Sequence, residues 1–381
     1  MTLVLDEALL DDAEALAAAD RGATLLAVAG AGAQVRMAVT AAEEAGVRRI
    51  ADDGRPRCVV VAALGSSAMV GDLLNAFAGP SSPVPVQAVH SSTLPGWVGP
   101  VDLVVAVSLS GAAEGPLAVA AEAARRGCRL LTVGAAGSPL ADVSAQARGI
   151  HVPVARDLRS SRSSLWALTV PVLMGAAALG LVDMPAYALA EAADALDEVA
   201  ERARPSSETF VNPAKSLALD VAGSIPLVLG EGELAGVAAN RASYQLARYA
   251  RHPAVAGVLP DAAAQIVATF DGPFATSSED VFADPFEDGG RTALRLILMR
   301  DETAESTTRT VTDVVRDTAL AGGVRVSELT ATGEHGLARI AGLVALTDFA
   351  AIYLALGAGL DPLTSPHVAD LRDGVRRETR L

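Results

Sequence analysis

The sequence contains few aromatic residues, two cysteines and almost no lysine. Phe, Trp and Tyr make up 3% of its 381 residues, so we expect a core of Ala, Val and Leu rather than of aromatic rings. Cys58 and Cys128 lie in separate apolar runs and neither has a CxxC or other metal-type partner. This spacing predicts two reduced, buried thiols and no metal site. Lys215 is the single lysine, and every other cationic side chain is arginine.

Positive charge is also scarce. The formal net charge is −15, and no basic run interrupts the acidic background. Proteins that bind nucleic acid need a cationic surface to displace counterions from phosphates, so we exclude that class. The acidic N-terminal segment, residues 1–20, lacks the basic region of a signal peptide. Together with the reduced thiols, this predicts a protein of the cytoplasm.

One uncharged segment is long enough to raise the question of a membrane. Residues 165–182 form 18 consecutive positions without a charge, which just reaches the length of a membrane-spanning helix. The segment contains Pro171 and several small residues, and it lies between ordinary α/β segments. We therefore expect a helix in the core of a domain, and no membrane contact.

Short apolar runs alternate with alanine-rich helical segments through the first half of the chain. This alternation is typical of βαβ units and predicts a parallel sheet covered on both faces. The expected strands are 58–64, 84–89, 102–110, 128–135 and 150–155.

The same alternation begins again after a long helical stretch. Residues 165–203 are helical in pattern, and Pro205 ends them. Strands are then expected at 225–232, 265–270, 293–300 and 325–331, with a long helix at 336–357 near the end. We expect an α/β protein whose two subdomains each contain an open, mostly parallel sheet flanked by helices. The expected boundaries are 1–180 for the first subdomain, 181–210 for a helical linker and 211–381 for the second.

Two strand ends of the first half carry serines directly before a helix. Ser66 and Ser67 follow the first expected strand, and Ser108, Ser110 and Gly111 follow the third. A helix N-terminus has unpaired backbone N–H groups and a partial positive charge, so anions bind there. Each loop alone is explained by serine capping its helix. The same strand–Ser–Gly–helix order in both loops favours a phosphate site.

These loops resemble those of the sugar isomerase (SIS) superfamily, and within it those of the bifunctional phosphoglucose/phosphomannose isomerases. The first loop is similar to that family's GGSGxxGD, and the second to its SxSGNTEE. The matching residues are Ser67, Gly71, Asp72, Ser108, Ser110, Gly111 and Glu114. LPGWVGPVDLVVAVS, NPAKSLA and YLALGAGLDP are further similarities. The resemblance extends from about residue 55 to the end of the chain.

The resemblance implies two SIS-type subdomains, a homodimer, and aldose–ketose isomerisation of hexose 6-phosphates without a metal or other cofactor. Ser67, Ser108 and Ser110 would hold the phosphate, with Ser66 and Gly111 beside them. Arg162 would lie near C1 and C2 of the sugar. A guanidinium stays charged and donates in a fixed fork, which suits an enediolate.

The sequence departs from this family at its acid/base residues. Arg248 stands where the family has its glutamate base, and arginine cannot accept a proton at physiological pH. Ala263 falls at the ring-opening histidine, and Arg372 at the lysine of the last helix. His252 and His367 lie near these positions, and each is a candidate replacement acid or base or else a structural residue.

Two functions remain open at this point. The three replacements favour a phosphosugar-binding protein without the family's acid/base chemistry. The alternative is an active phosphosugar isomerase with a rewired acid/base set, so enzymatic activity is undecided from the sequence. Glu231 and Glu233 also follow a strand, and we expect them in a solvated strand-to-helix turn. The sequence contains no GxxxxGK[ST] motif, so it does not indicate a nucleotide-dependent reaction.

Overall fold

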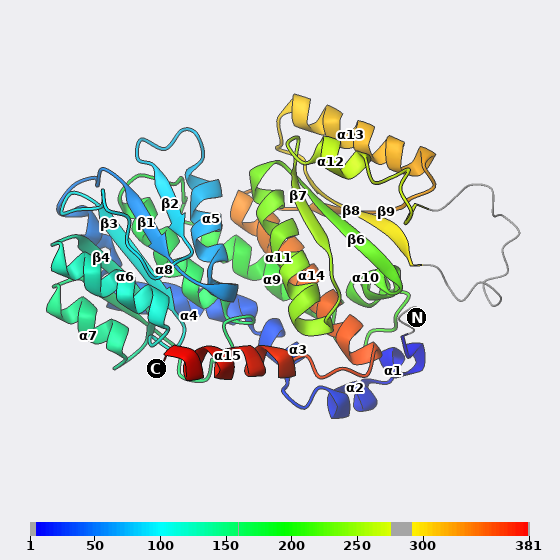
Figure 1. The fold of residues 1–381 in the computed structure, drawn as a ribbon, viewed down its shortest axis with the longest axis horizontal. Coiled ribbons are helices and arrows are strands. Elements are labelled where there is room, and N and C mark those ends of the chain that lie inside the picture. The colour runs from blue at the N-terminus through cyan, green and yellow to red at the C-terminus, as the bar shows by residue number, and fades with distance from the viewer. Residues whose placement is uncertain (1–4, 159, 276–291, 380–381) are drawn as a thin grey trace, which may run out of the picture.

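The structure is a computed structural model that describes residues 5–158, 160–275 and 292–379. Two parallel β-sheets occupy opposite halves of the molecule, and long helices lie between them (Figure 1). This arrangement confirms the α/β class with two open sheets. The first four residues of the acidic N-terminal segment lie outside the described part of the chain.

The first sheet contains the five strands of the first half in the order β2-β1-β3-β4-β5. All of its pairings are parallel. Each of the five expected runs contains one strand: β1 (Val59–Ala62), β2 (Val86–Val89), β3 (Leu103–Ser108), β4 (Arg129–Ala135) and β5 (Ile150–Val154). The inner strands β1 and β3 are buried throughout, as continuous apolar sequence predicts for a sheet covered on both faces.

The second sheet contains four parallel strands in the order β7-β6-β8-β9. They are β6 (Ser224–Glu231), β7 (Val255–Leu259), β8 (Ala293–Asp301) and β9 (Arg325–Ala331). The strand that follows β6 in the chain, β7, lies on one side of the central pair, and the strand that follows β8, β9, lies on the other side. The carboxyl ends of β6 and β8 therefore flank a topological switch point, where ligands commonly bind in open α/β sheets.

One predicted strand is wrong. Residues 265–270 were expected in the sheet, but Ala263–Val267 form the short helix α12, and the strand is β7, just upstream. β7 is an edge strand of five residues that contains Gly257 and lies between Pro253 and Pro260, and glycine and proline are more typical of a turn than of a strand. A Cβ on Gly257 would lie 2.5 Å from Ala262 Cβ, so glycine is required by the close approach of the chain that follows.

The remaining helices cover the sheets and fill the space between them. Their bounds are α1 (Glu7–Asp11), α2 (Ala13–Ala19), α3 (Thr24–Ala29), α4 (Ala31–Glu44), α5 (Met69–Ala78), α6 (Glu114–Arg125), α7 (Pro139–Gln146), α8 (Leu165–Ala178), α9 (Ala188–Arg202), α10 (Pro213–Val221), α11 (Gly232–Ala250), α13 (Ser306–Ala321), α14 (Gly336–Gly357) and α15 (Pro366–Thr379). Short 3₁₀ turns add η1 (Val47–Ala51) and η2 (Gly65–Ser67).

Alternate residues of each strand contribute to different cores. Val59 and Val61 of β1 belong to a large central core, which also contains α8, α11 and α14, while Val60 faces an outer core with α6 and α7. In the second sheet, Val228 of β6 likewise belongs to the central core, while Leu227 and Leu229 belong to an outer core beneath α12 and α13. The period of two along a strand thus packs both faces of each sheet.

The central helices are apolar on all sides because they are surrounded by protein. The uncharged segment that begins at Leu165 forms α8, and its residues from Leu165 to Ala176 are all buried, so it is a core helix as expected. Among the described residues, α14 is long and apolar enough to span a membrane, but 89% of its most apolar window is buried inside the structure. Cys58 and Cys128 are free and buried, and burial raises the pKa of both thiols.

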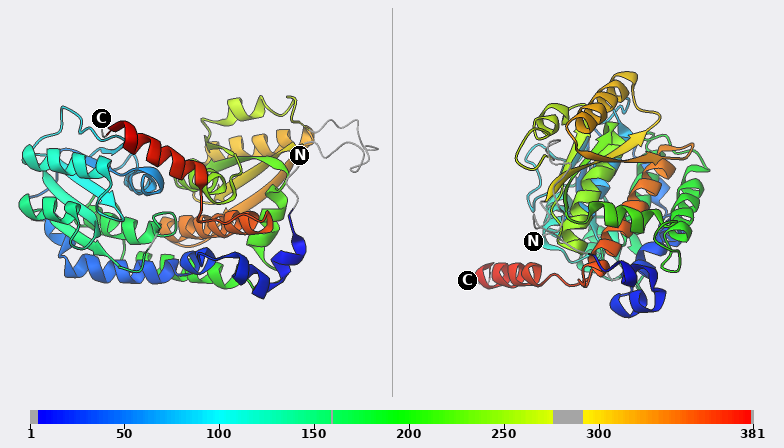
Figure 2. Two further views of the ribbon diagram at one scale, coloured as in Figure 1. Left: turned by 60° about the horizontal axis from the view of Figure 1, so that its bottom comes forward. Right: turned by 90° about the vertical axis from the view of Figure 1, so that its right-hand side faces the viewer.

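Both ends of the chain reach across the molecule. The N-terminal helices α1 and α2 lie beside the second half, where Asp6 N–H donates to Gly357 O at the end of α14 (Figure 1). Helix α15 projects from the body of the protein and runs toward the first half (Figure 2). Its described side chains are exposed or only partly covered.

Candidate functional site

The first serine loop is the 3₁₀ turn η2 between β1 and α5. Ser66 and Ser67 are 8% and 5% exposed, and Gly65 before them has a φ of +62°, a conformation that favours glycine. Ser66 Oγ lies 2.6 Å from Ser161 Oγ. This contact joins the turn to the segment that carries Arg162.

The second serine loop lies between β3 and α6. Ser108 Oγ accepts from Ala113 N–H at 3.3 Å, Ser110 Oγ accepts from Ala112 N–H at 3.3 Å, and the two Oγ atoms are 3.5 Å apart. Gly111 has a φ of +63°, and a Cβ there would lie 2.0 Å from Ser138 Oγ. The loop is therefore tight, and only glycine fits at its turn.

The two serine loops share one edge of the first sheet. β1 and β3 are parallel neighbours in register from Val59–Leu103 to Ala62–Ala106, so their carboxyl ends coincide. Helices α5 and α6, which follow these loops, both begin without a side-chain cap. Hydroxyls and backbone N–H groups thus gather at two adjacent helix N-termini, an arrangement that can hold an anion.

Arg162 is buried beside the first loop, and its side chain contacts backbone. Its Nη1 donates to Arg248 O at 3.1 Å and to Pro362 O at 2.9 Å, and its Nη2 donates to Leu363 O at 2.9 Å. The guanidinium also lies 4.8 Å from the centre of the Tyr249 ring. Burial lowers the pKa of Arg162, and the nearby guanidinium of Arg248 lowers it further.

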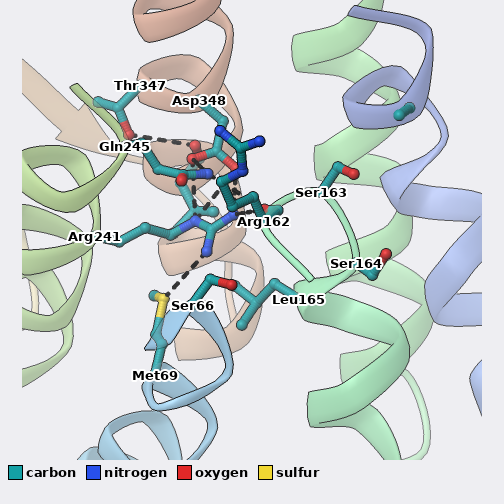
Figure 3. A network of polar contacts seen from close by, with 12 residues as sticks. Ser66, Met69, Arg162, Ser163, Ser164, Leu165, Arg241, Gln245, Thr347 and Asp348 are labelled. Atoms are coloured by element: carbon teal, nitrogen blue, oxygen red, sulfur yellow. Dashed lines mark hydrogen bonds and ion pairs between the residues drawn. The ribbon is translucent and has the colours of Figure 1, made fainter. Parts of the chain in front are cut away.

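A buried network holds the Arg162 segment in place. Arg241 on α11 donates to both carboxylate oxygens of Asp348 on α14, at 2.6 to 3.2 Å, and to Arg162 O at 2.7 Å. Gln245 donates to Asp348 Oδ1 and to the same carbonyl. Figure 3 shows side chains from α5, from the segment before α8, and from α11 and α14 converging at this point. The network fixes the segment between the two halves.

Arg248, which the resemblance places at the family's base, lies on the last turns of α11. The guanidinium of Arg248 lies 5.9 Å from the centre of the Tyr244 ring, and its Nε is buried without a hydrogen-bond partner among the described residues. A Cβ on Gly65 would be 3.8 Å from the Tyr244 hydroxyl, so this ring lies near the first serine loop. Tyr244 was not among the residues predicted for the site. Its signal was an aromatic residue one helical turn before Arg248 in a chain with few aromatic residues.

The two candidate histidines are placed differently. His252 is buried just after α11, and its Nε2 lies 2.8 Å from Ser224 O, so this nitrogen donates to a carbonyl. Burial lowers the pKa of His252, which keeps the ring neutral. His367 is fully exposed on α15, with its Nδ1 3.5 Å from Asp370. In the described part of the chain, no contact joins the two histidines.

The structure also describes the two other positions at which a family residue is predicted to be replaced. Arg372 is exposed on α15, and Ala263 begins α12 on the outer face of the second sheet. One expectation beside the second sheet is wrong: Glu231 is not solvated but 2% exposed, because Oε2 accepts from Asp301 N–H on the neighbouring strand β8. Glu233 is exposed, as expected.

Comparisons with known proteins agree with this arrangement. Residues 210–375 match the family described as the bacterial phospho-glucose isomerase C-terminal SIS domain. A bifunctional phosphoglucose/phosphomannose isomerase of Caldicellulosiruptor bescii is 26% identical over 306 residues, which cover 80% of this chain and 85% of that protein. This chain belongs to the SIS superfamily. It is related to the phosphoglucose/phosphomannose isomerases, as its serine loops suggest.

Solved structures of other proteins share the fold of this chain. A hypothetical protein from Thermus thermophilus has a TM-score of 0.70 at 15% identity, covering 98% of this chain and 95% of that one. A glucose-6-phosphate isomerase from Chlamydia trachomatis has a TM-score of 0.64 at 13% identity, covering 90% and 72%. The C-terminal domain of glucosamine-fructose-6-phosphate aminotransferase from Francisella tularensis has a TM-score of 0.62 at 12% identity, covering 89% and 97%. At these identities the likeness concerns the fold.

The network at the centre of this SIS protein leads to a stability prediction. Arg241→Leu should destabilise the fold by about 3–5 kcal/mol, because it leaves the carboxylate of Asp348 buried without its cation. The double variant Arg241→Leu/Asp348→Leu should cost less than Arg241→Leu alone. Urea unfolding of the three proteins measures the difference.

Arg36 provides the matched control for this double-mutant cycle. It pairs with Asp194 and Asp197 on the surface, with half of its side chain exposed. Arg36→Leu should cost no more than about 1 kcal/mol, since exposed ion pairs contribute little. Equal decreases in the free energy of unfolding for Arg36→Leu and Arg241→Leu would show that the buried ion pair does not hold the core together.

Proposed function

We propose that this SIS protein binds a hexose 6-phosphate at the two serine loops and does not isomerise it with the acid/base residues of its relatives. The observation that carries the proposal is the pairing of the loops at neighbouring strand ends, beside a helix turn on which arginine replaces the expected base. Retained anion binding together with a lost base describes a phosphosugar sensor or a non-catalytic relative.

The serine loops suit a phosphate because they supply donors of two kinds. The starts of α5 and α6 have no side-chain acceptor on their backbone N–H groups, and the hydroxyls of Ser66, Ser67, Ser108 and Ser110 lie beside them. The hydroxyls of Ser108 and Ser110 already accept from loop N–H groups, and the 3.5 Å contact between them uses one hydroxyl hydrogen at most, so at least one hydrogen remains available to an acceptor. A phosphate is such an acceptor, and it also gains from the positive ends of both helices.

Proton transfer between C1 and C2 needs a base within hydrogen-bond reach of the sugar. Arg248 cannot serve as one, since arginine stays protonated. His252 donates from Nε2 to a backbone carbonyl, which leaves only Nδ1 for such a task. The alternative, an active isomerase with a rewired acid/base set, therefore depends on Nδ1 of His252 or on the exposed His367.

The phosphate site makes a direct prediction. The double variant Ser108→Ala/Ser110→Ala should weaken binding of glucose 6-phosphate or fructose 6-phosphate at least tenfold, about 1.4 kcal/mol, because two donors to the phosphate are removed. Isothermal titration measures the change. The exposed Ser81→Ala is the control and should bind as the wild type does. Unchanged affinity in the double variant would rule out the proposed site.

The absence of a base predicts binding without exchange. In heavy water, glucose 6-phosphate, fructose 6-phosphate and mannose 6-phosphate should broaden or shift in NMR spectra with the protein, while no deuterium enters C2 and no sugar converts. Deuterium at C2 that disappears in His252→Gln would instead establish the rewired isomerase. Deuterium at C2 that persists in this variant would direct attention to His367.

We also propose that the protein is a cytoplasmic homodimer, as its resemblance to these isomerases implies. Helix α15 supports the dimer because it projects from the body (Figure 2) and Leu371 on it is 65% exposed. Leu371→Asp should shift the protein from dimer to monomer in light scattering after size-exclusion chromatography. Asp373→Ala on the same helix should leave the dimer intact. A wild-type protein that is monomeric would contradict the proposal.

A further inference from the structure

A second cavity lies at the carboxyl edge of the second sheet. Its volume is about 640 Å³, and it is lined by the ends of β6 and β8, the starts of α11 and α13, and the C-terminal end of α5. It thus occupies the switch point between β6 and β8, where the two neighbouring connections diverge. Its size falls within the range of pockets that hold small molecules.

This cavity is separate from the serine loops. Ser66 and Ser67 lie just before the first residue of α5, whereas Asn75 and Gly79, at the other end of that helix, line the cavity. The ten residues of α5 span roughly 15 Å, at 1.5 Å per residue. A ligand in the cavity therefore does not occupy the proposed phosphate site.

The chemistry of the cavity is opposite to that of the serine loops. Its lining residues include four carboxylates and no Arg, Lys or His side chain, among those that the structure describes. The four are Glu231, Glu233, Asp301 and Glu305. Glu231 and Glu305 are also the N-cap residues of α11 and α13, so negative charge already lies at both helix N-termini. A phosphate would meet repulsion where the first sheet offers donors.

Glu231 provides a buried acceptor without a donor. Its side chain is 2% exposed and lines the cavity; Oε2 accepts from Asp301 N–H at 3.0 Å, but Oε1 has no hydrogen-bond partner among the described residues. The nearest cation, Arg300 Nη1, is 3.6 Å from Oε1, and Arg300 also pairs with Asp313 and Glu328. A buried carboxylate oxygen without a donor is costly, and a donor brought by a ligand would remove that cost.

Asp301 completes the arrangement on the neighbouring strand. It is 5% exposed, its Oδ1 accepts from Thr303 N–H at 3.0 Å and from Thr303 Oγ1 at 2.8 Å, and Arg339 Nε lies 3.0 Å away. Its charge is therefore balanced by the protein. Glu231 is the carboxylate whose hydrogen bonding a ligand would complete.

The glycines of the loop serve packing rather than phosphate approach. A Cβ on Gly230 would lie 2.2 Å from the backbone of Ala235, so glycine is needed for α11 to start close to β6. Gly232 has a φ of +78° and turns the chain into the helix. Glu231 lies between these glycines, and Glu233 follows them. In a phosphate-binding loop the backbone N–H groups at this position are free to bind the anion, whereas here carboxylates lie beside them.

We propose that this cavity is a second ligand site, for an unphosphorylated, sugar-sized molecule that carries hydroxyl and ammonium donors. Glu231 Oε1 accepts from the ligand once its side chain turns from Arg300 into the cavity, and the surrounding carboxylates favour an amine and exclude a phosphate ester. The protein then has two sites of opposite charge preference on two sheets of the same fold. This inference is independent of the proposed function of the serine loops.

Glucosamine, glucose and glucosamine 6-phosphate are the probes for this site, used with the full-length protein in saturation-transfer NMR and isothermal titration. Glucosamine should bind the wild type more tightly than glucose does. Glu231→Gln should lower glucosamine affinity at least tenfold, and Ala304→Leu should weaken binding by narrowing the cavity. Ala304 carries no side-chain hydrogen bond, so this variant remains informative if Glu231→Gln is unstable. Thermal unfolding verifies that each variant is folded.

The double variant Ser108→Ala/Ser110→Ala separates the two sites. It should bind glucosamine as the wild type does, and glucosamine 6-phosphate should not displace glucosamine from it. Three results would overturn the proposal: no glucosamine binding to the wild type, an affinity for glucosamine that Ala304→Leu leaves unchanged, or displacement by glucosamine 6-phosphate in the serine variant. If Ala304→Leu weakened glucosamine binding but Glu231→Gln did not, the proposed role of the Glu231 carboxylate would be contradicted.

Discussion

The buried ion pair between Arg241 and Asp348 is the interaction on which the geometry of the molecule's centre depends. Both charges are removed from water, and this cost is recovered only when the guanidinium and the carboxylate keep their hydrogen bonds. Those bonds fix α11 against α14, and Arg241 Nη2, which is one of the two nitrogens bonded to Asp348, also donates to the carbonyl of Arg162. Arg162 in turn binds three carbonyl oxygens from the end of α11 and from the segment that follows α14. A chain of charged hydrogen bonds therefore sets how the second half presents α11 to the serine loops of the first.

The two sheets show how one fold yields opposite electrostatics. Each sheet ends its central strands at helix N-termini, which carry partial positive charge in both halves. In the first half the loops before these helices carry serines, whose hydroxyls add donors without adding charge, and a carboxylate follows in the first turn of each helix, Asp72 in α5 and Glu114 in α6. In the second half glutamates stand at the N-cap positions themselves, and neither side chain bonds the N–H groups of its helix. The backbone thus provides the same anion-binding tendency twice, and the loop residues before the helices add hydroxyl donors at one edge and carboxylates at the other.

Features that depend on local sequence were predictable, and those that depend on distant contacts were not. The valine runs of β1 and β3 and the long apolar stretch of α14 predicted their elements, because a buried strand or helix must be apolar throughout. The edge strand β7 was missed, since its pairing with β6 compensates for a weak local pattern. The serine loops were found from residue order alone. The burial of Glu231 was missed because it results from pairing with a strand 70 residues away, and the carbonyl partners of Arg162 lie 86 to 201 residues away.

The position of Arg248 shows that the proposed replacement of a base at this point is compatible with an intact fold. The backbone carbonyl of this residue accepts from Arg162, so the main chain at this point belongs to the buried network. Its side chain, in contrast, lies against the ring of Tyr244 and takes no part in the ion pair at the centre. A change of side chain there therefore alters the local charge but not the backbone hydrogen bond to Arg162 that helps to hold α11 in place. Structural support is thus carried by the main chain of this residue, which leaves its side chain open to the replacement that we propose.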